Sequence, residues 1–89
     1  MIRRRVIVSG RVQGVFFRDT CRWEALAAGV RGWVRNRPDG TVEAVFEGDA
    51  GAVERMVRWA GEGPREAVVS GLTVAEEEPR GEDGFTITR

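Results

Sequence analysis

The chain has 89 residues, enough for one small domain with a single hydrophobic core and too few for a second domain. Fourteen acidic residues balance fourteen basic ones, so the zero formal net charge offers no long-range attraction to nucleic acid or to an anionic membrane. All the basic residues are arginines and histidine is absent, which excludes His-activated nucleophiles, lysine Schiff bases and a lysine-containing phosphate loop. Arginine remains as the fixed cation for an oxyanion.

The single cysteine, Cys21, can form neither an internal disulfide nor a zinc site by itself, which is typical of a reducing compartment. The apolar stretch after the basic residues 3–5 is too short for a signal peptide, and no other stretch is long enough to span a membrane. We therefore expect a cytoplasmic protein with one domain over residues 1–89.

Apolar residues recur with the periods of strands and helices, and glycine and proline separate the segments. In chain order the predicted elements are a strand over 5–10, a helix over 18–28, strands over 32–37 and 41–47, a helix capped by Asp49 and ending before 61–64, a strand over 67–75 and a short strand at 85–87. The turn Pro38-Asp39-Gly40 predicts a hairpin with one buried face. Residues 3–5 are expected at a solvated strand edge, and residues 76–83 in a solvated loop.

This order, βαββαβ plus a short extra C-terminal strand, predicts an α+β ferredoxin-like two-layer sandwich, in which an antiparallel sheet carries two helices on one face. In that architecture the loop of residues 11–17 lies beside the strand that contains Asn36. Arg18 and Asn36 are therefore expected to face one small site. Each residue also has a simpler interpretation, because an arginine at a helix start is usually solvated and an asparagine before a hairpin usually stabilises the turn.

The segment between the first strand and the first helix has the composition of an anion-binding turn. Gly10 and Gly14 allow backbone amides to turn inward without interference from a Cβ atom. A helix that begins near Arg18 adds unpaired amide donors and the positive end of its dipole. A phosphate or a carboxylate is the expected ligand.

Two motifs resemble the signatures of the acylphosphatase family, and the resemblance covers nearly the whole chain. The first motif is a strand followed by Gly10-Arg11-Val12-Gln13-Gly14-Val15-Phe16-Phe17-Arg18. The second motif is Gly32-Trp33-Val34-Arg35-Asn36, followed by Gly40-Thr41-Val42 and Gly48. The C-terminal half matches more loosely, at Ser70-Gly71 and at the last residues Ile87-Thr88-Arg89. These departures concern packing and leave both motifs intact.

The resemblance implies that Arg18 and Asn36 form a catalytic pair and that the preceding loop cradles a phosphoryl group with its backbone. The residues of this phosphate-binding loop are Val12, Gln13, Gly14, Val15, Phe16 and Phe17. The implied activity is hydrolysis of small acyl phosphates to a carboxylate and inorganic phosphate, without a cofactor.

The residues present are sufficient for such a reaction without a metal. The Arg18 fork and the loop amides can hold the phosphoryl oxygens, and the Asn36 side chain can orient the attacking water. A carboxylate leaving group has a pKa of about 4 and departs without protonation, so direct in-line attack needs no histidine. Ser9 and Cys21 lack an activating partner and are assigned no role.

Other interpretations remain open. The chain could be a non-catalytic ferredoxin-like module that binds an anion or RNA, although neutral charge and a core-facing Phe46 disfavour RNA. It could also correspond to the acylphosphatase-like module of a larger maturation enzyme. The acidic run 76–78 is expected to be solvated and to hold no metal. We expect a monomer that acts on a small acyl phosphate and binds neither nucleic acid nor a membrane. Trp23 and Trp59 could pack against the rest of the domain or form a surface for a partner.

Overall fold

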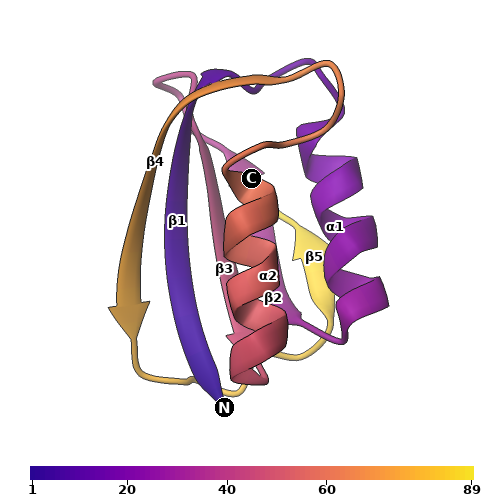
Figure 1. Cartoon of the computed structure of the whole chain (residues 1–89), viewed down its shortest axis with the longest axis vertical. Coiled ribbons are helices and arrows are strands. Elements are labelled where there is room, and N and C mark those ends of the chain that lie inside the picture. The colour runs from indigo at the N-terminus through magenta and orange to yellow at the C-terminus, as the bar shows by residue number, and fades with distance from the viewer.

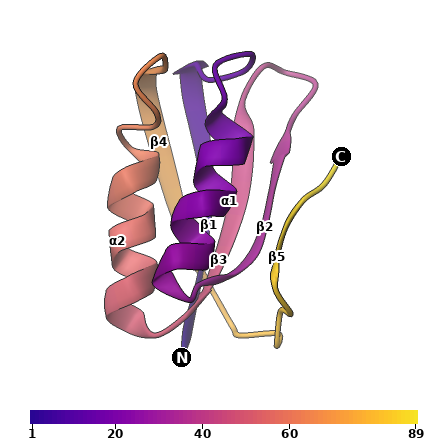
Figure 2. The same cartoon turned by 90° about the vertical axis from the view of Figure 1, so that its right-hand side faces the viewer.

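Seven elements form two layers in the computed structural model, which describes residues 1–89 (Figure 1). In chain order they are β1 (Ile2–Arg11), α1 (Phe17–Ala28), β2 (Arg31–Asn36), β3 (Val42–Gly48), α2 (Ala50–Ala60), β4 (Val68–Glu77) and β5 (Phe85–Ile87). The strands form one sheet in the order β4-β1-β3-β2-β5, and both helices cover the same face of it (Figure 2). The predicted ferredoxin-like sandwich is confirmed.

The sheet is mixed, which corrects the expectation of an antiparallel sheet. The first four strands pair antiparallel, whereas β5 pairs parallel with β2. The reason is the path of residues 78–84, which cross from one edge of the sheet to the other at the end where the N-terminus lies (Figure 1). Because β5 begins at this end, where β2 also begins, the two strands run in the same direction.

The core lies between the helices and the sheet. On β1 and β3 every second residue points into it, and on the helices small residues allow close packing. Its largest contributors are Phe17, Phe46, Met56 and Phe85. On α1 the buried residues are Phe17, Cys21 and Ala25, and Ala28 is partly buried against the same core. Asp49 occupies the position before α2, but its side chain makes no capping hydrogen bond.

The basic start of the chain is part of an inner strand of the sheet, not a solvated edge. The strand β1 begins at Ile2 instead of residue 5, and it lies between β3 and β4. Arg3 is 1% exposed and its guanidinium donates to Glu47, Glu77 and Glu82 at 2.8 to 3.1 Å. The sequence pattern missed this burial because the partner carboxylates come from distant segments.

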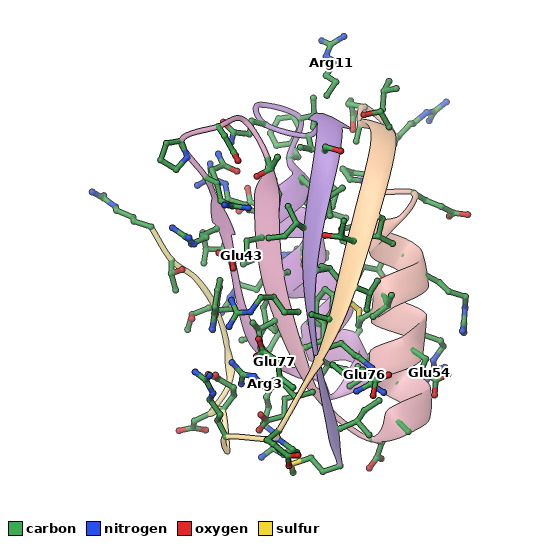
Figure 3. All side chains as sticks on the ribbon, turned by 90° about the vertical axis from the view of Figure 1, so that its left-hand side faces the viewer. Arg3, Arg11, Glu43, Glu54, Glu76 and Glu77 are labelled. Carbon is green, nitrogen blue, oxygen red and sulfur yellow. The ribbon has the colours of Figure 1, made fainter.

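The acidic run also departs from its prediction. Glu76 and Glu77 extend β4 and point to opposite sides of the sheet, Glu77 toward Arg3 and Glu76 toward α2 (Figure 3). Glu77 accepts hydrogen bonds from Arg3 and Arg5 at 2.9 and 2.7 Å. These two bonds, partly offset by burial, lower the pKa of Glu77 to about 2. Residues 78–84 alone form the expected loop.

The hairpin strand β3 is buried on both faces, whereas one buried face was predicted. Its helix-facing residues lie in the core. On the open face Glu43 binds Arg5 and Arg35 at 2.7 and 2.6 Å, and the Arg5 guanidinium lies 5.4 Å from the ring centroid of Trp33. This layer of paired charges covers the middle of the sheet. Because β3 is the middle strand of the sheet, side chains of the neighbouring strands also bury the face that carries no helices.

Glu47 connects the loop between β4 and β5 to the charged residues on the open face of the sheet. It is fully buried and accepts hydrogen bonds from the backbone amides of Arg80, Gly81 and Glu82 at 2.8 to 2.9 Å, and from Arg3. Burial by itself raises the pKa of Glu47, but these donors outweigh it and lower the pKa to about 2. The carboxylate is therefore charged and satisfied in the folded protein.

Neither helix has the length and apolar character needed to cross a membrane.

Candidate active site

The loop between β1 and α1 contains two residues in the left-handed region, Gly14 at φ 74° and Phe16 at φ 64°. A Cβ atom on Gly14 would meet nothing within 4 Å, so the backbone angle, not crowding, calls for glycine there. Phe16 is the only non-glycine residue with a positive φ, a conformation that costs about 1–3 kcal/mol. The two left-handed residues bring the chain around to start α1 at the end of the sheet opposite the N-terminus (Figure 1).

Gly10 has a different role from the one predicted. It lies within β1, at the shift in register between β1 and β4. A Cβ atom there would lie 2.3 Å from the carbonyl oxygen of Val68. Gly10 therefore permits the close approach of β4 and is not part of the turn that presents amides to an anion.

The backbone amides of this loop are free to donate. No amide N–H from Val12 to Asp19 donates to a backbone carbonyl, and the first such bond of the helix runs from the Thr20 amide to the Phe16 carbonyl at 3.1 Å. The residue before α1, Phe16, also provides no side-chain cap. Unpaired amides combined with the positive end of a helix dipole favour a bound anion.

Arg18 and Asn36 meet in one pocket of about 260 Å³, as predicted. Arg18 lies in the first turn of α1 and Asn36 is the last residue of β2, so the pocket joins the two layers. Its lining residues are Val12, Gly14, Phe16, Phe17, Arg18, Asp19 and Asn36.

Both polar side chains of this pair are available to a ligand. The Arg18 guanidinium forms no ion pair, unlike those of Arg3, Arg5 and Arg35. The Oδ1 atom of Asn36 is buried and has no hydrogen-bond partner within the chain. A buried acceptor without a partner is costly, and at the wall of a pocket it calls for a donor from a bound water or ligand.

Gln13 and Val15 lie outside the pocket lining, although the sequence placed them in the phosphate-binding loop. The Gln13 side chain donates to the carbonyl oxygens of Arg37 and Thr41 at 2.8 and 2.9 Å. These two bonds connect the loop to the turn that follows Asn36. Val15 is 3% exposed and anchors the loop in the core. Both side chains thus hold the loop in place, while their amides stay unpaired.

Asp19 is a lining residue that sequence reasoning did not find. An acidic residue in the first turn of a helix is common because it interacts favourably with the dipole. No motif distinguishes Asp19 from such a residue, so only its position beside the pocket reveals it.

The unassigned nucleophiles lie away from the pocket. Cys21 is fully buried in the core, and this burial raises the pKa of its thiol strongly. The hydroxyl of Ser9 contacts the Gly71 carbonyl on β4 at 3.4 Å. Neither group is placed to attack a bound ligand, in agreement with the sequence.

Fold and pocket together define a two-layer α+β domain with a polar pocket at the first strand-to-helix loop, where unpaired amides and the Arg18 guanidinium have the polarity to suit an oxyanion. The model of the acylphosphatase family matches residues 4–87. The chain belongs to the acylphosphatase family, whose members are hydrolases that act on acid anhydrides.

Similar proteins agree with this assignment. An acylphosphatase from Rubrobacter xylanophilus is 63% identical over 87 residues, which cover 96% of this chain and 78% of that protein. Another from Pelotomaculum thermopropionicum is 56% identical over 86 residues, covering 96% and 94%. The crystal structure of acylphosphatase from Bacillus subtilis has a TM-score of 0.96 at 38% identity, with both chains fully covered. A similar domain also occurs in the crystal structure of full-length HypF in its phosphate- and nucleotide-bound form. The TM-score is 0.90 at 28% identity, and the match covers 99% of this chain and 12% of that chain.

Proposed function

We propose that the chain hydrolyses small acyl phosphates by in-line attack of water on phosphorus, with Arg18 and Asn36 as the catalytic residues and without a metal. The observation that carries this proposal is the pocket in which an unpaired guanidinium, a buried unpartnered amide oxygen and a row of free backbone amides come together. Each group has the polarity that one component of the reaction requires.

Arg18 and the amides hold the phosphoryl group. In phosphoryl transfer negative charge is spread over three equatorial oxygens, and catalysis consists mostly of positioning and electrostatic stabilisation. The planar Arg18 fork can bind two oxygens, and the free amides of the loop supply further donors that are already oriented. Phe16 and Gly14 set the loop conformation that presents these donors.

Asn36 orients the nucleophile. Its unpartnered Oδ1 can accept a hydrogen bond from water, while its amide group can donate one. An amide does not titrate, so it directs a water molecule without removing a proton from it in the ground state. The leaving carboxylate is a weak base and requires no general acid, which suits a chain without histidine.

The alternative of an RNA-binding module finds little support. Such modules stack bases on aromatic side chains of the central strands, on the open face of the sheet. In this chain the open face of β1 and β3 carries Arg3, Arg5, Glu43 and Glu47, which pair with one another and with Glu77. Trp33, on the neighbouring β2, is covered by Arg5.

We further propose that residues 1–89 act as one domain, as a monomer in the cytoplasm. The chain has a single hydrophobic core, and ion pairs within the chain cover the sheet face that carries no helices. Both features support a domain that is stable as a monomer. One buried unpaired cysteine is typical of a reducing compartment. Neutral charge favours neither nucleic acid nor anionic membranes as partners.

The test measures the rate of benzoyl phosphate hydrolysis before and after exhaustive treatment of the protein with a metal chelator. The decrease in benzoyl phosphate absorbance reports the rate. We expect full turnover in both samples. Loss of activity on chelation, with recovery when a divalent metal is restored, would contradict the metal-independent mechanism. Decay at the spontaneous rate in both samples would contradict the activity itself.

A further inference from the structure

A second pocket of about 500 Å³ adjoins the first and shares Phe16 and Asp19 with it. Its other lining residues come from α1 and from the end of β5, among them Trp23, Glu24 and Ile87. We call this space the outer pocket and the Arg18–Asn36 pocket the inner pocket. Since they share two wall residues, a ligand can extend from one into the other.

The outer pocket gathers exposed apolar side chains at its mouth. Phe16, Trp23 and Ile87 are 68%, 77% and 38% exposed, and they come from a loop, a helix and a strand. Trp59, by comparison, packs on Phe17 with ring centroids 5.1 Å apart. Clustered exposed apolar groups beside a polar pocket mark a binding surface. Aromatic rings are especially effective there because they bury a large area at little entropic cost.

The charges around the outer pocket favour an uncharged ligand group. Asp19 and Glu24 contribute two carboxylates, against one guanidinium from Arg22. The Nε of Arg22 already donates to the Phe85 carbonyl at 3.0 Å. An acyl group that carries its own negative charge would meet a net negative wall.

We propose that the outer pocket binds the acyl group of the substrate and selects uncharged aromatic or bulky aliphatic acyl groups, with Trp23 as the main contact. This inference rests on the proposed function. When the phosphoryl group lies between Arg18 and the loop amides, the acyl group must leave the inner pocket through an opening. Phe16 and Asp19 line both pockets, so an acyl group that passes between them enters the pocket that Trp23 lines.

The experiment compares kcat/KM for benzoyl phosphate and acetyl phosphate in the native chain, Trp23→Ala and Leu26→Ala. Leu26 is the matched control because it is an exposed apolar residue of the same helix that lines neither pocket. We expect Trp23→Ala to lower the benzoyl-to-acetyl ratio by about three- to tenfold, the size of one aromatic contact. Leu26→Ala should leave the ratio unchanged, and Trp23→Phe should recover most of it.

Inhibition by inorganic phosphate provides a second readout, since it reports on the inner pocket alone. Its inhibition constant should be the same in Trp23→Ala as in the native chain. If both substrates are turned over and the ratio is unchanged in Trp23→Ala, the acyl subsite is wrong while the proposed function stands. If the native chain hydrolyses neither substrate, the proposed function fails and the subsite with it.

Discussion

Arg18 of α1 and Asn36 of β2 line one pocket, the first with an unpaired guanidinium and the second with a buried oxygen that has no partner. Elsewhere in the chain buried charges are fully paired, as Arg3 and Glu47 show. The Asn36 Oδ1 atom is the one buried side-chain polar atom without a partner, and we expect a bound water or ligand to complete it. The unpaired amides of the preceding loop belong to residues around the same pocket, which supports the proposed site.

Replacing Arg18 should abolish most of the activity without loss of fold. We expect Arg18→Ala to lower kcat by about 10²- to 10³-fold, the size of a lost oxyanion donor. Arg18→Lys should be almost as inactive, because a point charge cannot reproduce the bidentate fork. The measurement is steady-state hydrolysis of benzoyl phosphate, with the secondary structure checked by circular dichroism.

Arg11→Ala is the control for Arg18→Ala. Arg11 also flanks the loop, but it extends into solvent and lines neither pocket (Figure 3). It should retain nearly native rates. Near-native activity in Arg18→Lys would remove the argument from the planar fork, and equal losses in Arg11→Ala and Arg18→Ala would indicate a general charge effect.

Asn36→Ala should lose activity with little change in stability. The substitution deletes no hydrogen bond within the chain, because Oδ1 has none, so the free energy of unfolding should change by less than about 1 kcal/mol. We expect kcat to fall by about 100-fold, since the water loses its orienting group. Urea unfolding and initial rates measure the two effects. Full activity in Asn36→Ala would show that Asn36 does not position the water.

Gln13 is a positioning residue, and its replacement should weaken the coupling between the loop and the turn after Asn36. Gln13→Ala removes two hydrogen bonds, to the carbonyls of Arg37 and Thr41. We expect a stability loss of about 1–2 kcal/mol and a fall in kcat/KM of about tenfold as the loop amides lose their orientation.

The matched variant for this position is Gln13→Met, which roughly keeps the size of the side chain and adds no charge but removes the two donors. We expect inorganic phosphate to inhibit both Gln13→Ala and Gln13→Met more weakly than the native chain, because the loop amides are less well oriented. Unchanged phosphate inhibition in both variants, together with reduced stability, would mean that Gln13 is only structural.

Glu47 makes the stability of the protein depend on pH. Its folded pKa of about 2 lies below its ordinary value of 4.5, so the folded state favours the charged form. The stabilisation is complete above pH 4.5 and is lost as the pH falls toward 2, and it amounts to at most about 3 kcal/mol. Urea unfolding at pH 7, 4 and 2.5 should show this decrease.

Glu47→Gln should flatten the pH dependence and destabilise the protein at pH 7, because the loop amides and Arg3 lose a charged acceptor. The remaining slope comes from groups such as Glu77, whose pKa is also lowered to about 2. An unaltered slope in Glu47→Gln would show that Glu47 contributes nothing to it.

Sequence by itself was sufficient for the order of the elements, the sandwich and the pairing of Arg18 with Asn36. The first two features follow from apolar periods and turn residues, and the third from the predicted sandwich topology together with the two motifs. The predicted bounds of α1 and of the β2–β3 hairpin are within one residue of those observed. The family assignment followed from the same two motifs.

Only the tertiary structure decided which charged residues are buried and which pocket walls meet. Arg3 looked like a solvated cation until β1 was placed between β3 and β4, where Glu47 and Glu77 surround it. Likewise Trp23 and Ile87 form one outer pocket only because β5 pairs with β2 beside α1. Burial and contact between such distant residues depend on the order of strands in space, and a local pattern carries no information about partners far along the chain.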